Sequence, residues 1–402
     1  MRRTRRLAVV AAFVAAALSL SLVSATSAEA GVTSRYIVTV SGTGPLGSVL
    51  GSVANSLSGI TVVHTFQAAL RGGVVDASPA AAALLATLPG VTVEPDSVVT
   101  LSGTEAPTPS WGLDRIDQAN LPLGNSYSYT TTGAGVRAYM IDTGIQGSNT
   151  DFGGRAIAGT NTVDASSPLT DCNGHGTHTA GTVGGTAYGV AKGVTLVAVR
   201  VFGCSNSTTV SAIVTGVDWA TADHKAHPGP AVANMSIGGG SSSALDTSVR
   251  NMIASGVSTA VAAGNNSANQ CTSSSPAEVS QAIVVGATDI NDTLASFSNY
   301  GSCVDVNAPG VNIVSDYMGA NNATATLSGT SMATPHVTGA AARYLQANPT
   351  ASPATVETAL INASTKGVVK GIATSCNLLQ SLLGRCGGYG TPNRLLYASP
   401  AS

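Results

Sequence analysis

The chain has 402 residues, of which only 9% are charged, and its formal net charge at pH 7 is −2. From residue 104 onward, 12 basic residues are set against 16 acidic ones, so a basic nucleic-acid-binding surface is not supported. The low charge and the abundance of glycine, alanine, serine and threonine fit a tightly packed, secreted protein better than a disordered chain, and the length allows two or three domains.

Residues 1–30 have the features of an export signal. Four arginines precede an apolar run at 7–23, and Ala28-Glu-Ala30 supplies a small-residue cleavage site before Gly31. The run is also close to the length of a membrane anchor, which is the alternative interpretation. The cleavage site favours removal, and no later segment is long and apolar enough to span a bilayer. We therefore expect a secreted protein that has no membrane contact once the signal is removed.

Residues 31–103 are predicted to form a small α+β domain. Strands are expected at 36–40, 73–75, 91–93 and 98–101, which together complete an open sheet, and helices at 46–57 and 78–88. A stretch rich in proline, serine and threonine at 103–110 is typical of an exposed linker.

From Gly135 onward, apolar runs rich in β-branched residues alternate with helical stretches. Strands are predicted at 136–141, 194–201, 231–237, 257–263 and 282–286, and helices at 208–226, 244–254, 331–346 and 353–361. This pattern predicts an α/β domain at 104–402, with a mostly parallel sheet and helices on both faces. Active sites of such sheets lie at the carboxyl ends of strands, where Asp142, Ser236 and Asn265 stand.

Three glycine-rich segments each contain one residue type used in nucleophilic catalysis. They are Tyr139-Met-Ile-Asp142-Thr-Gly144, Asn173-Gly-His175-Gly-Thr-His178 and Ser328-Gly-Thr-Ser331-Met-Ala-Thr-Pro335. Ser331 precedes a helix whose N–H groups can stabilise a negative oxygen, although an ordinary capping serine is the alternative. His175 is flanked by glycines, while His178 is more typical of a structural histidine. The pair lacks the i, i+4 spacing and the glutamate of zinc hydrolases.

The order of these residues along the chain distinguishes classes of serine hydrolase. An α/β-hydrolase needs serine, then acid, then histidine, but only Glu357 and His336 follow Ser331, in the wrong order. The order aspartate, histidine, serine is that of subtilisin. An esterase with the same nucleophile and a peptide-binding module with a decayed site are the alternative functions. The esterase function is not favoured, because the chain lacks the residue order of the α/β-hydrolases. The peptide-binding module would need a catalytic residue to be replaced, and none of them is.

Further segments resemble the subtilisin-like serine proteases, in particular the proteinase K branch and its aqualysin-type secreted bacterial members. The resemblance covers about residues 107–397, and its additional motifs are 111–117, 188–193, 233–239, 261–266 and 296–301. It implies a secreted serine endopeptidase that is monomeric, needs no catalytic cofactor and cuts proteins and peptides. It also implies broad specificity, with a preference for an apolar or aromatic P1 residue, the residue just before the cleaved bond.

The resemblance assigns roles to individual residues. It implies a catalytic triad of Asp142, His175 and Ser331, and an oxyanion hole formed by the Asn265 side chain and the Ser331 N–H group, with a turn residue as the alternative for Asn265. The walls of the P1 pocket would be Ser236, Ile237, Gly238 and Gly239 on one side and Ala262, Ala263 and Gly264 on the other. On the strand that faces the substrate from the other side, the family's Gly-Ser-Gly run is replaced by the residues at 204–209. The side-chain preference at substrate positions further from the cut bond is therefore not predicted.

All six cysteines lie beyond residue 170, and an even number in an exported domain predicts disulfides. Sequence alone does not choose the pairing. A metal cluster is the alternative, although no Cys-x-x-Cys pair exists. The resemblance pairs Cys172 with Cys204 and Cys271 with Cys303, which leaves Cys376 and Cys386 for each other.

The resemblance also implies structural Ca²⁺, which prefers oxygen ligands. One site would combine Asp305 with the carbonyl oxygens of Ser280 and Ala282. A second would use Asp114, Asp117 and Gln118, for which a surface turn is the alternative. The acidic ligand of a third site is absent, because Val368 stands near its place.

Residues 34–101 resemble the inhibitor-like propeptide of the same family, especially at 36–40 and 93–96. This implies a precursor in which residues 31–103 act as an intramolecular inhibitor and as a folding template, since a parallel sheet with many non-local contacts folds slowly. We expect the tail at 98–102 to occupy the active-site cleft and to be cut by the enzyme itself.

Overall fold

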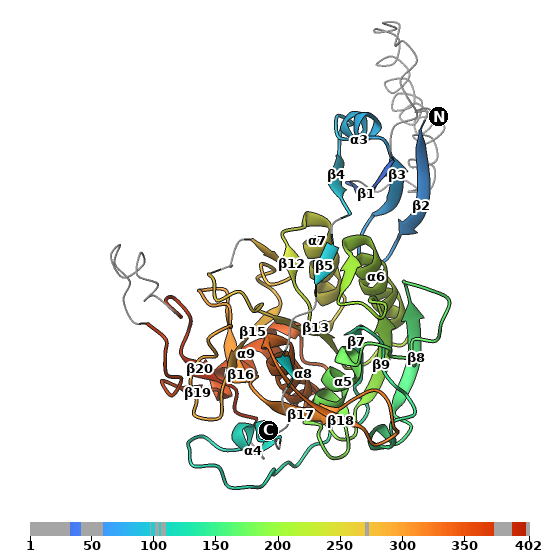
Figure 1. The fold of residues 1–402 in the computed structure, drawn as a ribbon. Helices are drawn as coiled ribbons and strands as arrows, with labels where there is room; N and C mark the ends of the chain where they lie inside the picture. Colours follow the sequence, from blue (N-terminus) through green and yellow to red (C-terminus); the bar gives the residue numbers. More distant parts are fainter. Residues whose placement is uncertain are drawn as a thin grey trace, which may run out of the picture.

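The computed structural model describes residues 33–41, 59–96, 98–100, 104–105, 110–269, 273–373 and 388–398. The predicted export signal and the predicted helix at 46–57 lie outside these residues. The described chain forms a small antiparallel sheet that stands on a larger α/β part (Figure 1).

The larger part is organised around a nine-stranded sheet, as counted within the described residues. Its strands are parallel except for β19, which pairs antiparallel with β20. In spatial order they are β19 (Thr365–Lys366), β20 (Arg394–Leu395), β16 (Val306–Pro309), β15 (Ile283–Thr288), β13 (Val257–Ala262), β11 (Ala231–Met235), β7 (Arg137–Asp142), β9 (Thr195–Arg200) and β8 (Ala156–Asn161). The five predicted strands are β7, β9, β11, β13 and β15, and the remaining four were not predicted.

Helices cover both faces of this sheet, so the predicted fold class is confirmed. The helices α5 (His175–Gly184), α8 (Thr330–Ala347) and α9 (Pro353–Ala363) lie on one face, and α6 (Val210–Ala226) and α7 (Ser243–Ala254) lie on the other (Figure 1). In β7, Ala138 and Met140 belong to the apolar core under α5, α8 and α9, while Tyr139 and Ile141 belong to the core under α6 and α7. A strand with apolar contacts on both faces therefore has a continuous apolar sequence.

Short elements complete the larger part. They are α4 (Gly112–Ile116), the 3-10 helix η1 (Thr150–Phe152), β10 (Ser207–Thr209), β12 (Gly239–Gly240), β14 (Ser274–Ser275), β17 (Ile313–Asp316) and β18 (Thr324–Ser328). The predicted helix at 208–226 begins two residues late, because Thr209 is extended and its hydroxyl caps α6 by accepting from the N–H of Ala212.

The small sheet has the order β2 (Ile60–Phe66), β3 (Gly72–Ala77), β1 (Ser34–Val40) and β4 (Val91–Pro95), with α3 (Pro79–Leu85) beside it. We did not predict β2, whose alternation is interrupted by a bulge between Val62 and His64. The prediction that 98–101 completes this sheet is wrong. Instead, β5 (Val98–Thr100) pairs with β10 of the larger part. Within the described residues, β10 has no other strand beside it, so its N–H and C=O groups are available to β5.

Two carboxylates of the small part join it to the larger one at helix N-termini. Glu94 accepts from the N–H of Ala244 in α7 at 3.1 Å, and Asp96 accepts from the N–H of Ser211 in α6 at 2.5 Å. The first N–H groups of a helix have no partner within it, and the helix dipole favours negative charge there. The two carboxylates therefore supply helix caps from outside the larger part.

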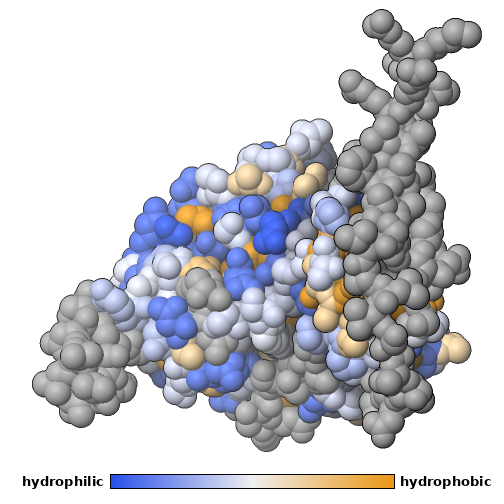
Figure 2. All heavy atoms as spheres, turned by 90° about the horizontal axis from the view of Figure 1, so that it is seen from above, coloured by the Kyte–Doolittle hydropathy of each residue, from blue (hydrophilic) through white to orange (hydrophobic). Residues whose placement is uncertain are grey.

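No helix in the described segments has the length and apolar character needed to cross a membrane. In the view from above, hydrophobic residues are scattered among hydrophilic ones over the surface that is not grey (Figure 2).

Candidate active site

The carboxyl end of β7 and the start of α5 bring two of the predicted residues together. Asp142 ends β7 and is fully buried, and its Oδ1 lies 2.8 Å from Nδ1 of His175, the first residue of α5. Asp142 also accepts from the N–H of Thr143 at 2.8 Å and from the hydroxyl of Thr179 at 3.3 Å. These bonds fix the carboxylate, which in turn fixes the imidazole ring.

The position of His175 depends on the glycine before it. Gly174 caps α5 with a φ of +94°, and a Cβ at this position would lie 2.3 Å from the Tyr317 ring. Only glycine meets both demands. Burial of His175 opposes its positive charge, but the negative charge and hydrogen bond of Asp142, helped by the charge of Asp171, raise its pKa above the ordinary value.

Ser331 lies in the first turn of α8 and is 3% exposed. Its hydroxyl donates to the carbonyl oxygen of Ser236 at 3.1 Å, and the Ser236 hydroxyl donates back to the Ser331 carbonyl at 2.7 Å. This exchange holds the start of α8 against the chain that follows β11. Within the described residues, Nε2 of His175 has no hydrogen-bond partner.

Asn265 follows β13 and is fixed by the residue next to Ser331. Its Oδ1 accepts from the Thr330 N–H at 2.8 Å and from the Thr330 hydroxyl at 2.9 Å. Because the oxygen is held against Thr330, the amide NH₂ group at the other end of the planar carboxamide points away from Thr330. A neutral donor is thereby oriented beside the start of the helix.

A cavity of about 310 Å³ opens beside these residues. It is lined by Ser236, Ile237, Gly238, Gly239, Ala262, Gly264, Asn265 and Ser331, all predicted from sequence, and by Gly240, Asn266, Ser273, Ser274 and Thr330, which were not. Of the predicted wall residues, Ala263 lies elsewhere: it is 3% exposed and belongs to the core under α6 and α7. Ser273 and Ser274 carry no sequence signal of their own, because only the pairing of β14 with β12 brings them here.

Extended segments flank the start of α8. β5 pairs antiparallel with β10, with Thr100 opposite Ser207, and it also lies against β12. β6 (Thr104–Glu105) pairs antiparallel with β18, with Thr104 opposite Ser328, three residues before Ser331. The short stretch between β5 and β6, residues 101–103, lies outside the described residues.

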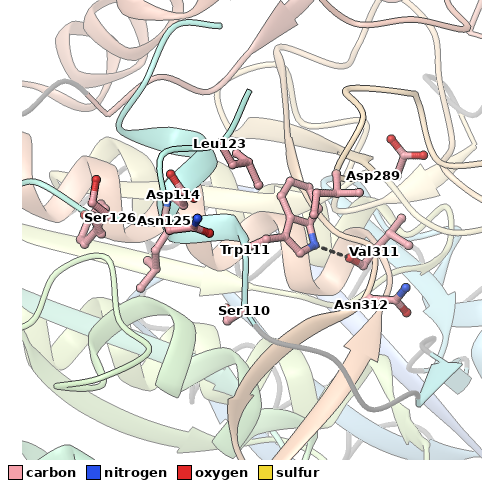
Figure 3. A pocket seen from close by; sticks show the side chains of 12 residues that line it. Ser110, Trp111, Asp114, Leu123, Asn125, Ser126, Asp289, Val311 and Asn312 are labelled. Carbon is pink, nitrogen blue, oxygen red and sulfur yellow. Dashed lines mark hydrogen bonds between the residues drawn. The ribbon is translucent and has the colours of Figure 1, made fainter. Parts of the chain in front are cut away.

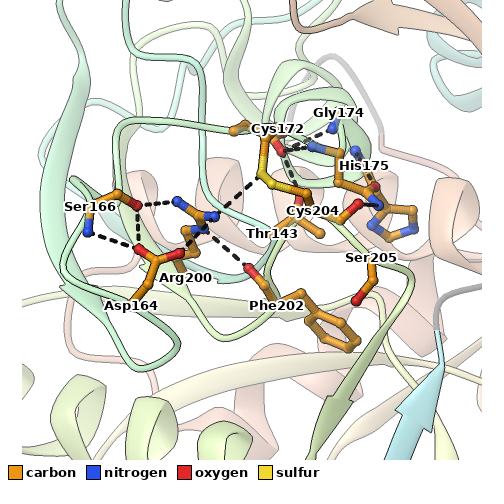
Figure 4. The surroundings of a disulfide bond; sticks show 12 residues. Thr143, Asp164, Ser166, Cys172, Gly174, His175, Arg200, Phe202, Cys204 and Ser205 are labelled. Carbon is orange, nitrogen blue, oxygen red and sulfur yellow. Dashed lines mark hydrogen bonds and ion pairs between the residues drawn. A yellow bond between two sulfur atoms is a disulfide. The ribbon is translucent and has the colours of Figure 1, made fainter.

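The disulfide between Cys172 and Cys204 confirms one predicted pair, and it joins the segment before His175 to the chain after β9 (Figure 4). Buried Arg200 donates to the Cys172 sulfur at 3.4 Å. The bridge closes a loop of 32 residues, worth roughly 3 to 4 kcal/mol in the chain-entropy account. Cys303 is also disulfide-bonded. The three other cysteines, Cys271, Cys376 and Cys386, lie outside the described residues.

Asp305 lies beside the turn that contains Ser280 and Ala282, since its Oδ2 accepts from the N–H of Val284 at 2.8 Å. Burial raises the pKa of Asp305 to about 6. Burial and the charge of Asp305 together raise the pKa of Glu357, on α9, to about 7. In both groups burial is the main cause of the raised pKa, because it disfavours the charged carboxylate.

The second predicted calcium set is arranged differently. Asp114 accepts from the N–H groups of Gly124 at 3.0 Å and Asn125 at 2.7 Å, and Gln118 Oε1 also accepts from Gly124 at 3.0 Å. Asp117 accepts from the N–H of Ser128 at 2.6 Å. Their oxygens therefore already meet N–H donors. Asp114 lines a cavity of about 760 Å³ next to Trp111 (Figure 3).

Comparisons with known proteins agree on one family. The subtilase family model matches residues 133–377. The chain is 52% identical over 315 residues to an extracellular serine proteinase of Thermus sp. (strain Rt41A), covering 78% of this chain and 76% of that protein. It is 47% identical over 335 residues to alkaline serine exoprotease A of Vibrio alginolyticus, covering 82% of this chain and 62% of that protein.

The structure is similar to a crystal structure of a cold adapted subtilisin-like serine proteinase, with a TM-score of 0.65 and 47% identity over 72% of this chain and 97% of that one. The fold and the arrangement at the strand ends thus define a serine endopeptidase. The chain belongs to the subtilase family.

Proposed function

We propose that this chain is a secreted endopeptidase of broad specificity in which Ser331 is the nucleophile, His175 the base and Asp142 the residue that orients the base. The Ser331 hydroxyl turns from the Ser236 carbonyl towards Nε2 of His175. Its oxygen attacks the carbonyl carbon of the peptide bond as its proton passes to Nε2, and that proton then passes to the leaving amine. Water hydrolyses the resulting ester by the same route.

The observation that carries this proposal is the 2.8 Å bond between buried Asp142 and Nδ1 of His175, which leaves Nε2 to accept a proton. Incubation of the secreted product with casein, with and without a serine-directed inhibitor, tests it. Cleavage that the inhibitor abolishes is the expected result. Cleavage that the inhibitor leaves intact would contradict a serine nucleophile.

We assign Asn265 to the oxyanion hole, together with the N–H of Ser331. Asn265→Asp keeps an oxygen that can accept from Thr330 but replaces the NH₂ donor, and Asn265→Ala removes both. Both variants are expected to lose about 10²- to 10³-fold in kcat with little change in KM, because the oxyanion exists only in the transition state. Steady-state kinetics on a peptide anilide measure this. A kcat near that of the parent in Asn265→Asp would remove the assigned role.

The 310 Å³ cavity supports a preference for an apolar or aromatic P1 residue, since glycine and alanine in its walls leave room for a large side chain. Sequencing the products of casein digestion would test this preference. An excess of cuts after charged residues would contradict it.

We further propose that residues 1–30 are a removable signal, that 31–103 are a propeptide and that 104–402 are the protease. The pairing of β5 with β10 and of β6 with β18 supports a chain that crosses the cleft as a substrate would. The enzyme would then cut its own chain between Thr100 and Thr104. The caps that Glu94 and Asp96 provide support the role of the propeptide as a folding template.

The site at Asp305 suits structural Ca²⁺, because its predicted ligands are one carboxylate and two carbonyl oxygens, all hard donors. The second set, Asp114, Asp117 and Gln118, is proposed as another such site; its oxygens also accept N–H groups, as Oδ2 of Asp305 does. The ion at Asp305 would stabilise the turn before β15 and would take no part in the chemistry.

Removal of calcium is expected to lower the melting temperature. At about 100 times its dissociation constant, a bound ion contributes about 2.7 kcal/mol, which corresponds to roughly 3 to 5 °C for a chain of about 300 residues or more. Calorimetry of the Ser331→Ala protein, which cannot digest itself, with and without excess chelator would measure the change. Asp305→Asn is the matched control and should respond less to chelator than the parent, because the ion at Asp305 no longer contributes. A parent protein that is insensitive to chelator would contradict the site.

A further inference from the structure

A third buried carboxylate lies next to the Asp142–His175 pair. Asp171 is 6% exposed and accepts five hydrogen bonds. Its Oδ1 accepts from the Thr143 hydroxyl at 3.0 Å and from the N–H groups of Asn173 at 3.0 Å and Gly174 at 2.9 Å. Its Oδ2 accepts from the Thr177 N–H at 2.9 Å and the Thr177 hydroxyl at 2.6 Å. Five donors thus converge on the two carboxyl oxygens, and hydrogen bonds of this kind are stronger when the acceptor is charged.

The donors come from the two segments that carry Asp142 and His175. Thr143 directly follows Asp142, and its hydroxyl oxygen also accepts from the N–H of Gly176 at 2.8 Å. The other donors, in 173–177, surround His175 on both sides. Asp171 therefore connects the end of β7 to the first turn of α5 by a route separate from the direct bond between Asp142 and His175.

The location also fixes a negative charge near the imidazole. The N–H of Thr177 belongs to the first turn of α5, where the helix dipole stabilises an anion. Three titratable groups act on His175: Asp142 from β7 and Asp171 from the loop before α5, both negative, and His178 from α5 itself. Burial lowers the pKa of His178 to about 3, so that residue is neutral at working pH, and Asp142 and Asp171 are the charged groups that act on His175 among the described residues.

We propose that Asp171 is a positioning residue of this active site, which holds the His175 turn against the end of β7 and stabilises the imidazolium that forms when Ser331 gives up its proton. The proposal rests on the proposed role of His175 as the base. Asp171 touches neither the substrate nor the reacting atoms, so it acts through His175.

The pH profile of kcat/KM separates this role from a merely structural one. His175 must be neutral to accept a proton, so activity rises as pH increases through its pKa. Asp171→Asn removes the negative charge, so the pKa of His175 falls and the acid limb moves to lower pH, by about half a unit to one unit. The maximum also falls, because an amide NH₂ now meets N–H donors. Hydrolysis of a peptide anilide between about pH 5 and pH 9 measures both effects.

Thr177→Val is the control that leaves the charge in place, since it removes one of the hydrogen bonds to Asp171, together with the bond that the Thr177 hydroxyl accepts from the Gln146 N–H. Its maximum should fall while its acid limb stays at the parental pH. An acid limb that stays in place in Asp171→Asn as well, with only a lower maximum, would overturn the proposal and leave Asp171 a structural residue.

A second measurement does not depend on turnover. The His175 ring can be titrated by NMR in ¹³C-histidine-labelled Ser331→Ala precursor, with and without Asp171→Asn, and with Asp171→Ser as a smaller neutral variant. A lower His175 pKa in either folded variant supports the proposal, and an unchanged pKa in both overturns it. If the parent enzyme proved inactive while the titration still shifted, the proposed function would fail and the electrostatic role of Asp171 would stand.

Discussion

Ser331→Ala is expected to leave the protein at precursor size and to lower turnover of an added peptide by about 10⁶-fold, the size known for the same loss in a related subtilisin. The Ser331 hydroxyl is the only group at the start of α8 that we assign to attack. Without it, no acyl-enzyme can form, so the enzyme can cut neither its own precursor chain nor an added peptide. Mass spectrometry of the secreted product and an anilide assay measure the two effects. Ser364→Ala, at the end of α9, is the control and should be processed normally.

The two readouts test different statements. A mature-sized Ser331→Ala product, made without added protease, would contradict self-processing and point to a second enzyme. Retained turnover would contradict the assignment of the nucleophile. Addition of a trace of parent enzyme should then cut the variant precursor, since the exchange of a hydroxyl for hydrogen leaves β5 and β6 paired as before.

Asp142→Asn is expected to cost about 10⁴-fold in kcat at neutral pH. The carboxylate accepts from Nδ1 of His175 and from the N–H of Thr143, so it holds the tautomer whose proton is on Nδ1. Both groups bond the same oxygen, Oδ1. An amide NH₂ at that position would present a donor to the ring and move the histidine proton to Nε2, where a lone pair is needed, whereas an amide oxygen there would keep the tautomer but lose the negative charge that stabilises the imidazolium. Exposed Asp164 gives the control, Asp164→Asn, which should stay near parental activity. A loss below tenfold in Asp142→Asn would contradict the orienting role.

Five strands of the central sheet, β7, β9, β11, β13 and β15, and the position of Asp142 could be predicted from sequence, because buried parallel strands are continuous apolar runs, and Asp142 stands at the end of one. The helix α5 could not. Its sequence contains three glycines and three threonines, which are poor helix formers, and all ten of its residues are buried. Packing of α5 against β7, β9 and α8 stabilises the helix, and the local sequence pattern does not show this packing.

The pairing partner of the short strand β5 could not be predicted from sequence either. The run at 98–101 has a strand composition, but composition does not say which edge it joins, and it pairs with β10 rather than β4. Asp171 was missed for a related reason. Four of its five hydrogen bonds come from residues close in sequence, yet nothing in residue type marks a carboxylate that collects backbone N–H groups. Ala263 was assigned to the pocket wall because its neighbours Ala262 and Gly264 are there, whereas alternation along the chain turns it to the core.

The strand edges beside the cleft have a consequence for the solubility of the protein. β10 has three residues and β12 has two, and β5 lies against both. Long exposed edges invite pairing between copies and are a common start of aggregation. Edges this short offer few N–H and C=O groups to a strand of another copy, so pairing with them adds little stability. Copies of the molecule therefore find little edge at this cleft on which to assemble.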